Sequence, residues 1–134
     1  IGFAIGRPEV VRAVNQVREP FNTSGFAQAA ALAALKDQEF VRRCREANHA
    51  GIRYLQDELK KLGLKTFPAY GNFVLFDCGR DAGTVFRELL KKGVIVRAIG
   101  YPTTIRVTVG TERENKKFIE ALAEVLNETA VAAE

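Results

Sequence analysis

From about residue 38 onward, short apolar segments of strand length alternate with amphipathic segments of helix length. In chain order they are a helix over 38–62, a strand over 73–76, a helix over 81–92, strands over 94–96 and 105–109, and a helix over 111–126. The segment 105–109 alternates apolar and polar side chains, as a half-buried strand does. With so few strands, we expect helices to cover one face of a small mixed or antiparallel sheet. This predicts an α/β chain whose residues 38–134 form an α+β domain.

The first 37 residues have a different character. Ile1–Ile5 is a short apolar run that predicts a strand, and Pro8 opens a helix at a position where the missing amide costs nothing. Ser24 can cap a second helix, in which Ala27–Leu35 is apolar nearly all round. Such a helix is usually buried on several sides. A lone strand and two helices without a sheet indicate the end of a different, larger domain, so we expect a boundary between residues 37 and 38.

The composition argues against several classes of function. The formal charge is +4 with a pI near 9.3, but acidic residues are interleaved with the basic ones, so no nucleic-acid partner is expected. No apolar run approaches the ~20 residues of a membrane span. A single histidine, His49, and two cysteines without metal-ligand spacing supply neither a zinc site nor a histidine-based triad. Two such cysteines are typical of reduced thiols in a cytosolic protein, and the lack of any methionine indicates a segment of a longer protein or a trimmed polypeptide.

Arg106 is the first candidate for a binding residue. It lies in the strand segment 105–109, where alternation places it on the face opposite its apolar neighbours and together with Thr104 and Thr108. A planar guanidinium on a rigid strand is suited to bidentate capture of a carboxylate or phosphate. The alternative is an ordinary solvent-facing arginine on a sheet, and the residues by themselves favour it.

Two further residues are candidates with weaker support. Arg97 follows the strand segment 94–96, and residues at the ends of strands often face a cleft between domains. It is therefore a candidate for a second anion contact, with an ordinary surface charge as the alternative. Tyr101 lies in a Gly-Tyr-Pro turn and is a candidate to offer its phenol to a ligand, although packing on its own loop is the commoner role.

The ordered set of segments resembles one family. The segments that carry the resemblance are Ile1–Glu9, Arg18–Asn22 with Ala27–Ala30 (R-E-P-F-N and A-Q-A-A), Gly71–Phe73, Gly93–Arg97 and Ile105–Thr111 with Glu114-Asn115. In this order they resemble the C-terminal portion of fold-type-I, class I/II aminotransferases of the histidinol-phosphate type, over residues 1 to about 126. Tyr70 and Gly71 depart from the serine-containing approach of that family.

The resemblance implies roles for the candidate residues. The arginine at Arg106 binds the anionic end of the amino substrate, and the one at Arg97 helps to hold it. The full-length protein would be a cytoplasmic homodimer with pyridoxal 5'-phosphate, and it would exchange the amino group of L-histidinol phosphate with 2-oxoglutarate in histidine biosynthesis. The resemblance also places the imine-forming lysine, the cofactor-phosphate arginine and the pyridine aspartate before Ile1. Since none of the eight lysines has a Ser-x-x-Lys context, we expect no catalytic residue, no bound cofactor and no activity in this chain alone.

Other functions stay open at this point. Within the superfamily, threonine-phosphate decarboxylases and aromatic aminotransferases have similar C-terminal segments. Outside it, a stand-alone α+β ligand-binding or regulatory module without catalysis fits the same pattern of elements.

Overall fold

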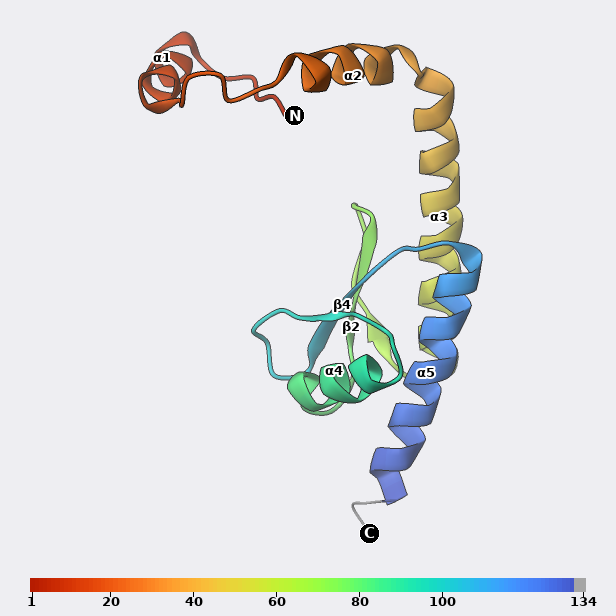
Figure 1. Cartoon of the computed structure of the whole chain (residues 1–134). Helices are drawn as coiled ribbons and strands as arrows, with labels where there is room; N and C mark the ends of the chain where they lie inside the picture. Colours follow the sequence, from red (N-terminus) through yellow and green to blue (C-terminus); the bar gives the residue numbers. More distant parts are fainter. Residues whose placement is uncertain (132–134) are drawn as a thin grey trace. The chain divides into compact units, whose positions relative to one another are not determined.

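The computed structural model describes residues 1–131, and the side chains of residues 1–128. The chain divides into two compact units, Ile1–Arg42 and Arg43–Glu134. The division falls within helix α3 (Gln38–Lys61), five residues beyond the boundary that we expected from the sequence. Figure 1 shows the elements of each unit along the chain.

The first unit contains two helices, α1 (Pro8–Val17) and α2 (Gly25–Lys36). Pro8 is the first residue of α1, and the Ser24 hydroxyl accepts a hydrogen bond from the Ala27 amide at 3.2 Å, so both expected helix starts are confirmed. The strand expected over Ile1–Ile5 was wrong, because residues 1–7 have no regular secondary structure. A strand needs a neighbour for its backbone hydrogen bonds, and no described segment pairs with this one.

Helix α2 is apolar but exposed. None of its residues is buried, and the Phe26 side chain is 92% exposed. An apolar helix of this kind usually lies inside a protein. The first unit therefore presents apolar surface that its own residues do not cover.

The second unit is built on a four-stranded antiparallel sheet with the order β1-β2-β4-β3. Its strands are β1 (Lys65–Thr66), β2 (Phe73–Asp77), β3 (Arg97–Ala98) and β4 (Thr104–Thr108). Its helices are α3, α4 (Ala82–Lys91) and α5 (Glu112–Val131). The small antiparallel sheet with helices confirms the expected fold class.

The strand expected over 94–96 was misplaced, because pairing begins only at Arg97. The cause is the end of α4, where Gly93 takes a left-handed conformation with φ +71° and the Val94 amide donates to the Leu89 carbonyl at 2.9 Å. This is the hydrogen-bond pattern of a glycine-terminated helix. Val94 and Val96 are still buried, so the apolar pattern marked core residues correctly but not their backbone pairing.

The core lies on one face of the sheet. Alternate residues of β2 and β4 turn inward to the helices, and the inward set is Val74, Phe76, Ile105 and Val107. They pack with buried residues of all three helices, among them Leu55, Leu59, Val85, Leu89, Phe118 and Leu122. Figure 1 shows α3 and α5 on one side of the sheet. The opposite face of β2 and β4 is therefore left free to present polar side chains.

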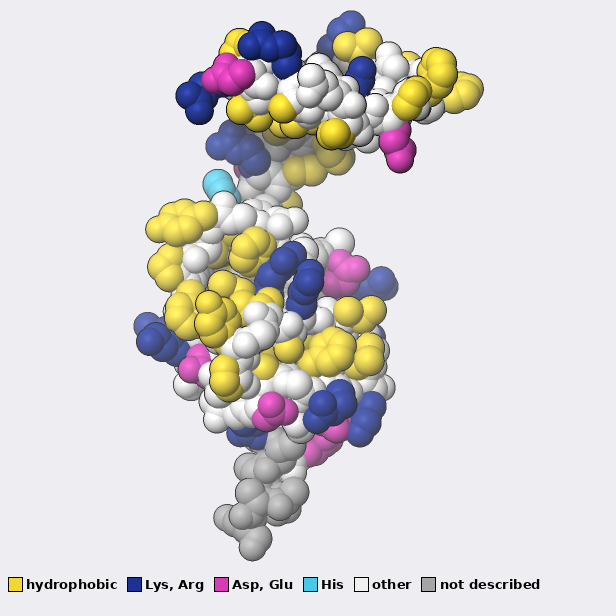
Figure 2. Space-filling model, turned by 90° about the vertical axis from the view of Figure 1, so that its left-hand side faces the viewer, with side chains coloured by type: hydrophobic (Ala, Val, Ile, Leu, Met, Phe, Trp, Pro, Cys, Tyr) yellow, Lys and Arg dark blue, Asp and Glu magenta, His cyan; other side chains and the backbone are white. Residues whose placement is uncertain are grey.

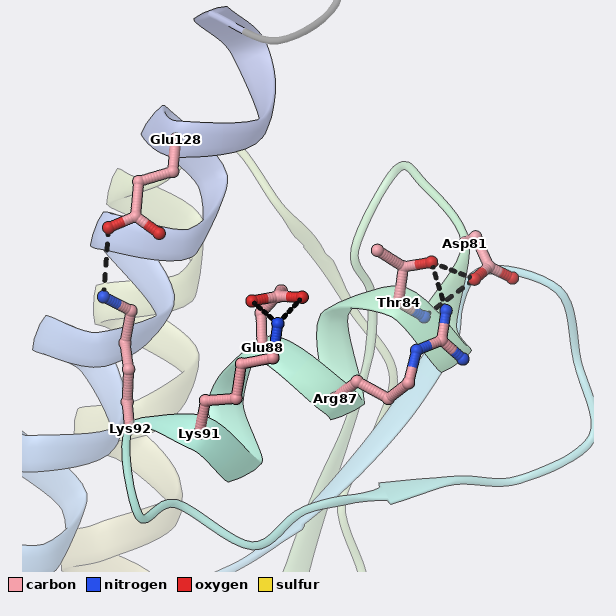
Figure 3. Close-up of polar contacts among 7 residues, drawn as sticks. All are labelled: Asp81, Thr84, Arg87, Glu88, Lys91, Lys92 and Glu128. Atoms are coloured by element: carbon pink, nitrogen blue, oxygen red, sulfur yellow. Dashed lines mark hydrogen bonds and ion pairs between the residues drawn. The ribbon is translucent and has the colours of Figure 1, made fainter.

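Polar contacts fix the ends of α4 (Figure 3). The Asp81 carboxylate accepts from the Thr84 amide at 2.7 Å and from its hydroxyl at 2.6 Å, which caps the N-terminus. At the other end, Lys92 Nζ lies 2.8 Å from a Glu124 carboxylate oxygen and 3.1 Å from one of Glu128. These ion pairs join the end of α4 to α5.

The N-terminus of α5 carries the expected capping box. The Thr111 amide donates to Glu114 Oε2 at 2.7 Å, and the Glu114 amide donates back to the Thr111 hydroxyl at 3.4 Å. The backbone hydrogen bond lowers the pKa of the Glu114 carboxyl below its ordinary value, and the bond from the Thr111 hydroxyl adds to the effect. The capping box thus fixes the start of α5 at Glu112, a short turn after the end of β4. Across the described residues, no helix is both long and apolar enough to cross a membrane.

Candidate anion-binding site

Arg97 and Arg106 lie opposite each other on neighbouring strands. Their Cα atoms are register partners between β3 and β4, and Leu75 of β2 is the partner of Arg106 on the other side. Directly opposed residues of an antiparallel pair point to the same face of the sheet. Since Ile105 and Val107 turn into the core, both arginines project from the free face.

The two arginines share a small pocket. It has a volume of about 250 Å³ and is lined by Ile95, Val96, Arg97, Arg106 and Thr108. Two guanidinium groups and a hydroxyl beside apolar side chains are suited to a small anion such as a phosphate or a carboxylate. In Figure 2, basic side chains of the second unit lie among hydrophobic ones on the face turned to the viewer.

Neither guanidinium is neutralised by another side chain. Among residues 1–128, no side-chain hydrogen bond or ion pair reaches the Arg97 or Arg106 guanidinium, whereas Lys61, Lys92 and Lys116 each contact a glutamate. Like charges directly opposite each other on a sheet are destabilising. An anion between the arginines would reduce this repulsion.

The acidic residue at the end of β2 makes a hydrogen bond with the loop that follows. Asp77 ends β2, and its Oδ1 accepts the Gly79 amide at 2.9 Å. That backbone hydrogen bond, assisted by the Thr103 hydroxyl, lowers the pKa of the Asp77 carboxyl below its ordinary value. Asp77 therefore stays charged near neutral pH, and its carboxylate is turned to the following loop.

A larger cleft of about 710 Å³ lies next to this pocket, with Ile95 and Thr108 in both linings. Its buried polar residue is Asn115, which accepts the Gly110 amide at 2.9 Å and donates to the Gly110 carbonyl at 3.2 Å. Those polar groups are already satisfied within the chain. We take the smaller pocket as the candidate site, because two facing arginines line it and neither makes an ion pair among the described residues.

Sequence and structure comparisons agree on the family. The family model for aminotransferase class I and II matches residues 1–122. The chain belongs to the class I and II aminotransferases. Histidinol-phosphate aminotransferase from Moorella thermoacetica is 50% identical over 129 residues, covering 94% of this chain and 33% of that protein. The same enzyme from Bacillus subtilis (strain 168) is 46% identical, covering 94% of this chain and 36% of that protein. The chain thus spans about a third of the length of these curated relatives.

Solved aminotransferases share the fold. The crystal structure of histidinol-phosphate aminotransferase from Sinorhizobium meliloti in complex with pyridoxal-5'-phosphate matches with a TM-score of 0.82 and 26% identity, over 91% of this chain and 35% of that one. A putative histidinol-phosphate aminotransferase from Erwinia carotovora atroseptica matches with a TM-score of 0.85 at 21% identity, over 93% of this chain. The second likeness shows the fold alone.

Three lysines of this aminotransferase chain each lie beside a glutamate. A lysine that forms an imine must reach its neutral form. Hydrogen bonds to glutamates do the opposite for three lysines: Glu58 raises the pKa of Lys61, Glu124 that of Lys92, and Glu112 that of Lys116. Within the part of the chain that the structure describes, no lysine lines the arginine pocket, and no group of potential metal ligands occurs.

The structure brings together two of the three residues predicted from the sequence. Arg97 and Arg106 meet in one pocket, but Tyr101 is 66% exposed on the loop before β4 and is absent from the pocket lining. A ligand role for Tyr101 stays a prediction. One neighbour was missed, since the Arg106 guanidinium carbon lies 4.6 Å from the centre of the Phe73 ring. Alternation in β2 was the available signal, because it places Phe73 on the face opposite Val74 and Phe76.

Proposed function

We propose that this chain is the substrate-anchoring C-terminal portion of a pyridoxal-phosphate-dependent aminotransferase that acts on L-histidinol phosphate and 2-oxoglutarate in histidine biosynthesis. Arg106 is the main contact for the anionic end of the substrate, and Arg97 is the second. The observation that carries the proposal is the pair of arginines that line one pocket across β3 and β4 without an ion pair to a described carboxylate. The identities of 46–50% to histidinol-phosphate aminotransferases support the choice of substrate.

The chemistry of both substrates fits an arginine pair. L-Histidinol phosphate carries a phosphate away from its reacting amine, and 2-oxoglutarate carries a carboxylate away from its reacting carbonyl. A guanidinium can bind either oxyanion with two parallel N–H donors. One arginine site can therefore serve both halves of the amino-group exchange.

The rest of the catalytic apparatus is proposed to lie in a longer enzyme of which this chain is one part. Pyridoxal phosphate supplies the electron sink for transamination when it is bound. Its imine-forming lysine and its phosphate and pyridine contacts would come from outside this chain, and the longer enzyme would be a cytoplasmic homodimer. The chain alone would then be inactive.

Steady-state kinetics of the longer enzyme test this proposal. Replacing Arg106 by alanine should raise the KM for L-histidinol phosphate about 10- to 100-fold, since a charge-assisted hydrogen bond contributes roughly 1.5–3 kcal/mol. Arg53→Ala is the control, because Arg53 is exposed on α3 and outside the pocket. An unchanged KM in Arg106→Ala would remove the assigned role.

Absorbance spectroscopy tests the inactivity of the chain itself. After incubation of the 134-residue chain with pyridoxal phosphate and removal of excess reagent, no stable imine band is expected. A stoichiometric band that maps to one lysine would contradict the proposal that the imine-forming lysine lies elsewhere.

A further inference from the structure

Of the two neighbours of the Arg106 guanidinium, Arg97 on β3 repels it and Phe73 on β2 attracts it. β4 lies between β2 and β3 in the sheet. On the β3 side, Arg97 is its register partner and repels it. On the β2 side, its guanidinium carbon lies over the Phe73 ring, 4.6 Å from the ring centre. The Phe73 ring thus attracts the Arg106 guanidinium, which Arg97 repels.

The position of Phe73 follows from the register. Phe73 pairs with Thr108, two residues from Arg106 on the same face of β4. Diagonal neighbours of this kind are within reach when the side chains are aromatic or long. Phe73 is half-buried rather than buried, unlike Val74 and Phe76 on the core face. It does not contribute to the core as Val74 and Phe76 do.

Gly71 makes room for the ring. A Cβ atom built on Gly71 would lie 2.9 Å from Phe73 Cε1 and 3.3 Å from Cδ1, which is too close for unstrained contact. The turn that carries Gly71 is also fixed, because Asn48 Nδ2 donates to the Gly71 carbonyl at 3.1 Å. The ring therefore lies close to both Gly71 and Arg106.

We propose that Phe73 is a positioning residue that acts through Arg106. The attraction between its ring and the guanidinium restricts the rotamers of Arg106, so that the N–H groups remain available to the anionic end of the substrate. Without the ring, repulsion from Arg97 and side-chain rotation would spread the guanidinium over several rotamers. This inference rests on the proposed function, since it assigns Phe73 a part in the same anion site.

Kinetics of the longer enzyme provide the functional test. Phe73→Leu removes the π face and keeps an apolar side chain, and it should raise the KM for L-histidinol phosphate about three- to tenfold while kcat changes less than about twofold. Phe73→Tyr keeps the ring and should restore the KM to near the parent value. Phe67→Leu is the matched control, because Phe67 is also half-buried but lies beneath Lys65 rather than Arg106.

A substitution at Gly71 tests the same contact between Phe73 and Arg106. Gly71→Ala keeps the ring but displaces it, and should raise the KM in the same direction. In the Arg106→Ala background, Phe73→Leu should have no added effect, because a positioning residue has nothing left to position. If Phe73→Leu does not fold, the KM values of Gly71→Ala and Phe73→Tyr still test whether Phe73 positions Arg106.

NMR of the 134-residue chain tests the contact without any substrate. The ring current of Phe73 should shift the Arg106 δ-proton signals upfield, and the shift should disappear in Phe73→Leu and persist in Phe73→Tyr. If Arg106→Ala raises the KM but Phe73→Leu and Gly71→Ala do not, this inference is wrong and the proposed function stands. If Arg106→Ala itself leaves the KM unchanged, the proposed function fails, whatever the NMR result.

Discussion

Gly51 is the position where helix α3 has no room for a side chain. It is buried, and a methyl group at its Cα would overlap the Val109 Cγ1 methyl and lie 3.1 Å from Asn115 Nδ2. Val109 follows β4, and Asn115 holds the start of α5 through its two hydrogen bonds with Gly110. We therefore expect Gly51→Ala to disturb the junction of three elements at once.

The expected size follows from two opposing effects. Alanine is about 1 kcal/mol better than glycine in a helix interior. Overpacking a core costs roughly 1–3 kcal/mol, and displacing the buried Asn115 amide weakens hydrogen bonds that contribute about 1 kcal/mol each. The net effect should be a loss of about 1–3 kcal/mol in the free energy of unfolding. For a domain of this size, that lowers the unfolding midpoint by about 5–15 °C.

Thermal and urea unfolding followed by circular dichroism measure the effect. Gly83→Ala in α4 is the matched control, since the nearest atoms to its added Cβ would be side-chain atoms of Asp81 and Arg87 at 3.4 Å or more, and it should be neutral or slightly stabilising. Adding Val109→Ala to Gly51→Ala should recover part of the loss, because it removes the overlapping methyl. A Gly51→Ala chain as stable as the parent would refute this account of the α3 packing.

Two further predictions concern the carboxylates of Asp81 and Asp77. Asp81→Ala should lower the unfolding midpoint by about 4 °C because it removes the α4 cap, while Asp81→Asn should retain most of the stability, and equal midpoints for all three chains would contradict the capping role. Hydrogen bonds from Thr84 to Asp81 and from Gly79 to Asp77 lower the pKa of each carboxyl below its ordinary value of 3.8. Their contribution to stability is therefore complete above the unfolded pKa and is lost as pH falls through the lower folded pKa, so the urea midpoint should fall between about pH 5 and pH 2. A midpoint that is independent of pH over this range would count against these bonds.

The ends of several helices were predicted correctly from the sequence, because capping depends on residues that are close together in the chain. Ser24 and the Thr111–Glu114 capping box depend only on residues three positions apart, and both act in the structure as expected. Gly63 likewise follows α3 with φ +74°. Alternation also placed Arg106 on the free face, because side-chain direction along a strand has a period of two.

The remaining features depend on pairing between distant segments. The meeting of Arg97 with Arg106 requires the register of β3, which the apolar run 94–96 did not reveal because the end of α4 uses the Val94 amide. The contact of Phe73 with Arg106 likewise depends on the β2–β4 register, which the sequence does not reveal. Ile1–Ile5 has the composition of a strand but no partner among the described residues.

The central claim is that Arg106 and Arg97 recognise the anionic end of the substrate. The most direct measurement compares kcat/KM for L-histidinol phosphate and for L-histidinol, which lacks the phosphate, in the longer enzyme and its Arg106→Ala variant. The account predicts that Arg106→Ala lowers kcat/KM for the phosphorylated substrate about 10- to 100-fold and leaves that for L-histidinol nearly unchanged. Equal losses for both substrates, or no loss for either, would contradict it.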